Sequence, residues 1–260
     1  MANRVIGVIP AHLESTRLPR KPLRTILGHT MLTWVYRRAR QARCLDDLLV
    51  ATDSEEILAN CRANSIPVTM TSAAHRSGTD RIFEVMTQQA ARPHGAAAVY
   101  VNIQGDEPMI TPQHIELLVK PFQEDAETQV STLRVAMSLE EARDPNNVKV
   151  VTGAGGRALY FSRALVPYDR DAGQEAGARA PYYKHLGLYA YAAEALTRFH
   201  ELPPSPLEQR EKLEQLRFVE NGIAITVLET SIDTIGVDTE EDLRKVEECF
   251  RRTGTTMPGD

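Results

Sequence analysis

Cysteine and long apolar runs are scarce in this 260-residue sequence. The three cysteines, Cys44, Cys61 and Cys249, are odd in number and widely spaced, which excludes a disulfide framework and a zinc-finger pattern. No apolar stretch approaches the roughly 20 residues that span a membrane. The apolar run at the N-terminus is short and broken by Pro10, unlike the core of a signal peptide. We therefore expect a cytoplasmic protein without membrane insertion.

An excess of positive charge is also lacking. The 30 basic and 35 acidic residues give a net charge of -5, whereas a nucleic-acid-binding protein usually presents a basic face. We therefore expect no nucleic-acid partner. Positive charge does gather in residues 1–43, which hold nine Arg or Lys and one acid, Glu14. The group at 37–43 fits a surface helix, but the group at 17–24 lies in a predicted loop and needs another explanation.

Apolar runs and helical spacings alternate through the first half of the chain. The patterns predict strands at 4–9, 47–52, 68–70 and 98–103, and helices at 30–42, at 54–64, from 79 and from 111. Such alternation indicates an α/β fold with a mostly parallel central sheet covered on both faces. Ligands of these sheets bind beyond the carboxyl ends of the strands. Attention therefore falls on the loops 10–22, 52–54 and 104–108.

The second half has a different pattern, and we expect a single domain, 1–260, with a small β-rich lobe at about 150–220. The predicted elements are a hairpin of strands 148–152 and 158–162 around the turn 153–156, a strand at 186–192, a helix at 206–220, a strand at 223–229 and a last helix from Thr239. The glycines at 153–156 join two strands, which excludes a dinucleotide-binding fingerprint. Residues 171–182 are predicted to form a mobile loop.

The loop after the first strand carries the first chemical signal. Arg17, Arg20 and Lys21 place three cations within five residues, beside the hydroxyls of Ser15 and Thr16. Fixed cations that bind several oxygens suit a triphosphate, although no Walker motif is present. A solvated basic loop is the alternative.

Carboxylates supply the second signal. Asp106 follows the strand at 98–103 and a glycine that allows close backbone approach, which suits a magnesium ligand on a nucleotide. A turn with a capping acid is the alternative there. Asp238 precedes the last helix, where an acid is also favoured by the helix dipole alone.

Several segments together resemble one family. IPAHLESTRLPRKPL, HRSGTDR, VNIQGDEP, ALYFSR, KHLGLYAY, LEQLR and GVDTEEDL are similar, in this order, to segments of the 3-deoxy-manno-octulosonate (KDO) cytidylyltransferases. The resemblance implies a three-layer sandwich like that of nucleotide-diphospho-sugar transferases. It also implies transfer of CMP from CTP to KDO for lipopolysaccharide biosynthesis, with Mg²⁺ as cofactor and a homodimer whose contact involves the lobe at 150–220.

The resemblance further implies roles for individual residues. The nucleotide-binding set is Pro10, Ala11, His12, Arg17, Arg20, Lys21, Ser77, Gly78, Arg81 and Gln104. The metal ligands are Asp106 and Asp238, which with Lys21 form the catalytic set. The sugar-binding set is Arg163, His185, Tyr189, Glu211 and Gln215. Glu211 and Gln215 are four residues apart, so we expect them on one face of the helix at 206–220.

Two positions depart from the family pattern. The family usually has arginine where this chain has His12, and many members have glycine where it has Arg20. We therefore predict that Arg20 partly replaces the missing phosphate-binding arginine.

Alternatives to this function are a cytidylyltransferase for an 8-amino analogue of the sugar or for a phosphonate, a non-catalytic nucleotide-binding module, and a glycosyltransferase. The last would usually carry an Asp-x-Asp motif, which no predicted strand end has.

Overall fold

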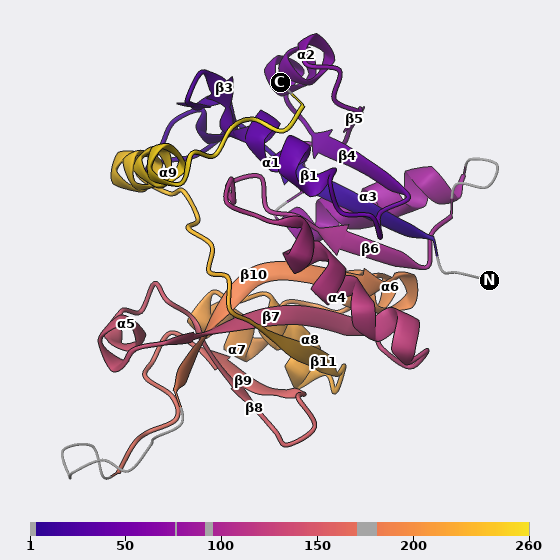
Figure 1. Ribbon diagram of the computed structural model, residues 1–260. Coiled ribbons are helices and arrows are strands. Elements are labelled where there is room, and N and C mark those ends of the chain that lie inside the picture. The colour runs from indigo at the N-terminus through magenta and orange to yellow at the C-terminus, as the bar shows by residue number, and fades with distance from the viewer. Residues whose placement is uncertain (1–3, 76, 92–95, 171–180, 260) are drawn as a thin grey trace.

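The computed structural model describes residues 4–75, 77–91, 96–170 and 181–259, and Figure 1 shows the arrangement of their helices and strands. Along the central sheet, the order of strands is β11 (Ile225–Thr230), β7 (Val130–Met137), β10 (Tyr182–Ala192), β6 (Val99–Asn102), β1 (Val5–Ala11), β4 (Asp47–Thr52) and β5 (Val68–Met70). β10 runs antiparallel to β6 and β7, while the other neighbours in this order are parallel. The mostly parallel sheet predicted from the sequence is thus confirmed.

β1 forms the centre of the sheet. Its apolar residues are almost fully buried, as expected for a strand with both faces covered. Its register pairs Ala11 with Thr52 of β4 and Val8 with Asn102 of β6. The carboxyl ends of these three parallel strands therefore meet at one edge, as the sequence predicted.

Helices cover both faces of the sheet and complete the three layers. One hydrophobic cluster packs on α1 (Met31–Ala39), α2 (Glu55–Ala63) and α4 (Pro112–Glu124). A second packs on α3 (Gly78–Ala90), α6 (Ala193–Glu201) and α8 (Gln215–Glu220). The remaining helices are η1 (Lys21–Leu23, a 3-10 turn), α5 (Leu139–Arg143), α7 (Pro206–Glu211) and α9 (Glu240–Thr253). Of the helices in the described ranges, none is both long enough and apolar enough to cross a bilayer.

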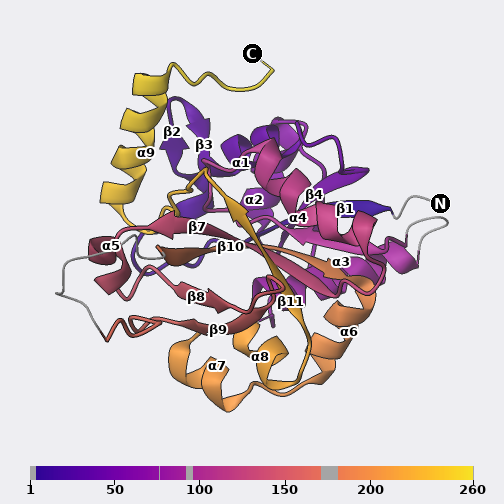
Figure 2. The ribbon, with the colours of Figure 1, turned by 60° about the horizontal axis from the view of Figure 1, so that its bottom comes forward.

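The lobe in the second half contains the predicted hairpin, β8 (Lys149–Thr152) and β9 (Ala158–Ser162), which extends the sheet from β10. In Figure 2, β8 and β9 lie beside α7 and α8 on the side of the molecule away from α9. The turn between the two strands is closed by a bond from the amide of Gly153 to the carbonyl of Arg157. The loop predicted to be mobile, 171–182, lies mostly outside the described residues.

Some predicted elements differ from the structure. The helix expected at 206–220 is broken into α7 and α8, because Lys212 takes a left-handed conformation with φ of 56°. Six elements were not predicted: η1, β7, α5, α6, and a ribbon of β2 (Thr25–Ile26) and β3 (His29–Thr30). Ser205 caps α7 and Thr239 caps α9, each as part of a capping box.

The last helix packs far from the strand that precedes it. α9 lies against the β2–β3 ribbon in both views (Figures 1 and 2). Leu243, Val246 and Phe250 share a third hydrophobic cluster with Trp34, whose indole N–H donates to the carbonyl of Ile26 at 2.7 Å. Burying an apolar side chain of this size contributes about 1.5–3 kcal/mol. This contact anchors the segment leading into α9, which contains Asp238.

Candidate active site

A cavity of about 940 Å³ opens at the carboxyl end of β6 and extends past β10 to the start of α8. Of the residues predicted to bind the nucleotide or the metal, four line this cavity: Arg17, Gly78, Gln104 and Asp238. From the predicted sugar set it is lined by Arg163, His185, Tyr189 and Gln215. Residues that the resemblance assigns to two substrates thus share a cavity, as direct transfer between those substrates requires.

Lys21 lies between the two aspartates assigned to the metal. Its Nζ is 2.6 Å from Oδ2 of Asp106 and 3.0 Å from Oδ1 of Asp238. The other oxygen of Asp238, Oδ2, is 2.8 Å from the guanidinium of Arg17. Burial lowers the pKa of Lys21, but the carboxylates of Asp106 and Asp238 outweigh burial, so the pKa is raised. Lys21 is therefore fully cationic at neutral pH.

Backbone contacts bring the two aspartates together. The amide of Val237 donates to the carbonyl of Asp106 at 2.9 Å, which fixes Asp238 beside the loop after β6. That loop also packs closely on the end of β1, since a β-carbon added to Gly105 would lie 3.0 Å from the carbonyl oxygen of Pro10. The glycine predicted to allow close approach does so here, above Pro10 and the buried Ala11.

Glu107 is a cavity residue that the sequence analysis did not identify. Its carboxyl group is buried, and its Oε2 has no hydrogen-bond partner within the described residues. Burial, together with the negative charge of Asp106, raises its pKa to about 8. The group is therefore mostly protonated at neutral pH and adds little negative charge beside Asp106.

The donor set at this end of the cavity suits a hard divalent cation. Asp106 and Asp238 present carboxylate oxygens toward a common point, the position of the Lys21 ammonium. The described residues contain no group of three or more His, Cys, Asp or Glu side chains that could hold a metal ion. Mg²⁺ commonly takes only one or two protein carboxylates and completes its shell with water and phosphate. Two aspartates next to a phosphate site therefore fit Mg²⁺ better than a metal held wholly by protein.

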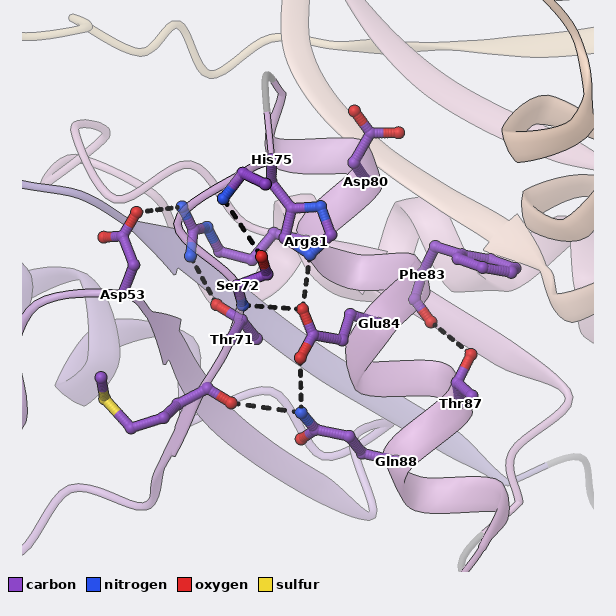
Figure 3. Close-up of polar contacts among 12 residues, drawn as sticks. Asp53, Thr71, Ser72, His75, Asp80, Arg81, Phe83, Glu84, Thr87 and Gln88 are labelled. Carbon is purple, nitrogen blue, oxygen red and sulfur yellow. Dashed lines mark hydrogen bonds and ion pairs between the residues drawn. The ribbon is translucent and has the colours of Figure 1, made fainter.

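Arg81, which the resemblance assigns to the nucleotide, is bound to side chains of the protein itself. This residue is only 4% exposed, and it is not among the described residues that line the cavity. Its guanidinium pairs with Asp53 at 2.9 Å and donates to the hydroxyl of Thr71, as Figure 3 shows. Because its donors are directed at these partners, Arg81 braces the chain between β5 and α3.

A second set of contacts holds the same segment. The carboxylate of Glu84 accepts from the backbone amide of Ser72 at 2.8 Å and contacts the ring of His75 (Figure 3). Ser77 then caps α3 by accepting from the amide of Asp80 at 3.1 Å, and Gly78 faces the cavity. The predicted nucleoside-binding residues Ser77 and Gly78 are thus held by side chains of α3 itself.

The structure does not support the compensation predicted for Arg20. Its guanidinium forms an ion pair with Glu56 in the first turn of α2, and it lies outside the described lining of the cavity. The backbone of Arg20 is left-handed, with φ of 57°. His12 is exposed at the end of β1. Of the three cations in this loop, Arg17 and Lys21 are the two that face the aspartates.

His185 and Tyr189 of β10 line the far end of the cavity. Nε2 of His185 lies 3.0 Å from the hydroxyl of Thr132, and the ring packs edge-on against Phe161. Burial lowers the pKa of His185 to about 3, so the imidazole is neutral at every physiological pH. Burial likewise raises the pKa of Tyr189 well above its usual range, so the phenol stays protonated. Both side chains can offer neutral hydrogen-bonding groups to a sugar.

Glu211 does not share a helix face with Gln215, contrary to the prediction. Glu211 ends α7, and its carboxylate accepts from the hydroxyl of Ser162 at 2.7 Å and from the amide of Arg163 at 2.9 Å. Nε of Arg163 donates in turn to the carbonyl of Glu211 at 2.9 Å. The left-handed Lys212 separates these residues from Gln215, which begins α8. Glu211 therefore positions Arg163, while Gln215 faces the cavity itself.

Two further groups near the sugar end were missed. Glu214 lines the cavity, is half-buried, and accepts from the hydroxyl of Thr79 at 2.9 Å. Burial raises its pKa. Lys149 is fully buried and donates to the carbonyls of Asp144, Asn147 and Arg163 at 3.1, 2.7 and 2.7 Å. Glu214 could have been identified as a site residue because it is adjacent to Gln215. Nothing in the sequence around Lys149 indicates that its side chain is buried.

Comparisons with known proteins show which family this chain is similar to. The family model for cytidylyltransferases matches residues 6–229. A 3-deoxy-manno-octulosonate cytidylyltransferase of Acidobacterium capsulatum is 56% identical over 246 residues, covering 95% of this chain and 96% of the relative. The enzyme of the same name from Koribacter versatilis is 52% identical over 248 residues, covering 95% and 90%.

A solved structure shows the same similarity. The structure of a CMP:2-keto-3-deoxy-manno-octonic acid synthetase complexed with CTP superimposes on this one with a TM-score of 0.88. The two sequences are 41% identical, and the match covers 96% of this chain and 99% of the synthetase chain. A glucose-1-phosphate thymidylyltransferase structure from Bacillus anthracis, at 15% identity and a TM-score of 0.64, shares the fold alone.

Proposed function

The chain belongs to the cytidylyltransferase family, and within it to the 3-deoxy-manno-octulosonate cytidylyltransferases. From that premise we propose that it transfers CMP from CTP to KDO, releasing pyrophosphate and forming CMP-KDO for lipopolysaccharide biosynthesis. One observation carries this proposal. The cavity joins a cationic, carboxylate-bearing end at Arg17 and Asp238 to an end with neutral hydrogen-bonding groups at His185, Tyr189 and Gln215.

The composition of the sugar end favours a hydroxylated acid. Arg163 offers a guanidinium that can pair with a carboxylate, and Glu214 and Gln215 offer acceptors and donors for hydroxyl groups. A small phosphonate would leave the buried amide of Gln215 without a ligand partner, at a cost in binding free energy. KDO is therefore the preferred acceptor, and its 8-amino analogue remains the nearest alternative.

The reaction proposed is an in-line attack of the anomeric hydroxyl of the sugar acid on the α-phosphorus of CTP. The contribution of the protein is positioning and charge neutralisation. Arg17 and Lys21 would neutralise the phosphates, and Arg163 would orient the acceptor through its carboxylate. Asp106 and Asp238 would hold Mg²⁺, which when bound supplies charge for the leaving pyrophosphate and acidifies the attacking hydroxyl.

The expected outcome of a substrate panel is pyrophosphate release with CTP, KDO and Mg²⁺ together, and little release when any one is replaced or removed. The assay crosses ATP, CTP, GTP and UTP with KDO, its 8-amino analogue and a phosphonate, each with and without EDTA. Equal release with ATP, or full activity in EDTA, contradicts the proposal. Preference for the amino sugar would change the acceptor and leave the reaction class intact.

We also propose that two chains form a homodimer through the lobe at 150–220. Within the described residues β9 itself pairs only with β8, and on its other side an isolated bridge joins Arg157, just before β9, to Thr226 of β11. Leu159 on β9 is 58% exposed and Tyr168 is 83% exposed, which is unusual for large apolar side chains in a monomer.

Sedimentation velocity is expected to give a dimer for the wild type and a monomer for the double variant Leu159→Asp, Tyr168→Asp. Met70→Asp is the matched control, because Met70 is 37% exposed on β5 at the opposite end of the sheet. A wild-type monomer at micromolar concentration, or a dimer that survives the double variant, would refute this interface.

A further inference from the structure

One ammonium group serves both aspartates of the proposed metal site. Nζ of Lys21 lies 2.6 Å from Asp106 and 3.0 Å from Asp238, and the Lys21 side chain is only 16% exposed. Arg17 binds the remaining oxygen of Asp238 at 2.8 Å. Two cations therefore face two carboxylates, and the formal charge of this group of four side chains is zero.

A divalent ion cannot occupy this position together with Lys21. Mg²⁺ lies about 2.0–2.1 Å from its oxygen ligands. An ion at that distance from Oδ2 of Asp106 and Oδ1 of Asp238, on the side that Nζ of Lys21 occupies, would overlap the ammonium, which contacts the same two oxygens. The aspartates can hold either the Lys21 ammonium or the metal ion, and the lysine has to move before the metal binds.

Charge favours the lysine until a triphosphate is present. Adding a divalent ion to a neutral group of side chains leaves two uncompensated positive charges next to the displaced ammonium. A bound triphosphate supplies the negative charge that both cations need. Lys21 lies in the 3-10 turn η1, and its four-carbon side chain can swing without backbone movement, toward the phosphates that it is proposed to bind.

We propose that Lys21 competes with the divalent ion for Asp106 and Asp238, so that the ion binds tightly only together with the nucleotide. Lys21 thereby keeps the two aspartates in place and prevents premature metal binding. This inference rests on the proposed metal role of Asp106 and Asp238 and deepens it. By linkage, the nucleotide and the ion should raise each other's affinity by the same factor.

The test measures Mn²⁺ binding to the purified protein without nucleotide, from the electron paramagnetic resonance signal of the free ion. Lys21→Met is expected to bind Mn²⁺ at least ~10-fold more tightly than the wild type, within the usual range of such couplings. Arg20→Met is the matched control, because it removes the same charge from the same loop while its partner is Glu56. The control should keep the wild-type affinity.

Two further measurements separate the possible outcomes. A non-hydrolysable CTP analogue should raise the Mn²⁺ affinity of the wild type, after correction for ion bound to free analogue, and this arm does not depend on whether a variant folds. Adding Asp106→Asn to Lys21→Met should abolish the gain. If Lys21→Met binds Mn²⁺ no better than the wild type while Asp106→Asn weakens binding, the competition is refuted and the metal role stands. If Asp106→Asn changes nothing in either background, the metal role itself fails.

Discussion

Replacing Asp106 by asparagine is expected to lower kcat by about 100-fold or more while leaving the protein folded, because a carboxylate that anchors a catalytic metal is lost. Asparagine keeps the size of the side chain and removes its charge. Asp106 lies in a partly exposed loop whose fold depends on backbone contacts, including the bond from Val237 to its carbonyl. Those contacts do not use the carboxylate, so the melting temperature should change little.

Asp238→Asn should give a loss of similar size. The sequence left open whether Asp238 merely favours the start of the last helix. The structure assigns the capping of α9 to Thr239 and Asp242, whose side chains bond each other's backbone amides. The carboxylate of Asp238 is instead directed at Arg17 and Lys21.

Glu240→Gln provides the control for this pair of variants. It removes one negative charge from the first turn of the same helix, where Glu240 pairs with Arg24 outside the described cavity lining. Steady-state pyrophosphate release and thermal melting should be measured on all three variants. If Asp238→Asn lowers the melting temperature and spares turnover, Asp238 is a helix-end acid after all.

The sequence alone could predict those parts of the candidate site that directly follow the strands of the parallel sheet. Lys21 and Asp106 follow β1 and β6, and these parallel neighbours bring their carboxyl ends to one edge. Asp238 could be placed there only through family resemblance. Its position depends on the packing of α9 against Trp34, a contact between distant segments that no local pattern reveals.

Other errors have local physical causes. The break between α7 and α8 was missed because the left-handed residue is Lys212, where glycine would be the usual signal. β7 was missed because Ser131 and Thr132 interrupt its apolar pattern, although both are fully buried with their hydroxyls bonded to backbone carbonyls. The ion pair of Arg20 could not be predicted from the sequence, because its partner, Glu56, lies on another helix.

Lys149 illustrates a residue whose importance only the structure reveals, and Lys149→Met is expected to raise the KM for the sugar acid by about 10- to 100-fold. Its ammonium is fully buried and uses all three donors on the carbonyls of Asp144, Asn147 and Arg163. These acceptors belong to two segments that line the cavity. Methionine fills a similar volume but leaves the carbonyls unpaired, and small displacements of binding groups can cost about 100-fold in rate.

The effect should be confined to one substrate. The segments that Lys149 holds lie at the sugar end of the cavity, whereas Gly78 and Gln104 lie at the nucleotide end. The KM for CTP should therefore stay within about 2-fold of the wild type, a split that general destabilisation would not produce. Arg38→Met is the matched control. Arg38 is a partly buried cation and, like Lys149, donates to a backbone carbonyl, in this case that of Ile110 at 2.7 Å. It is not among the described residues lining the cavity, so its loss should lower the melting temperature and change neither KM. If Lys149→Met behaves like Arg38→Met, or loses CTP and sugar binding together, Lys149 stabilises the fold and does not position the acceptor site.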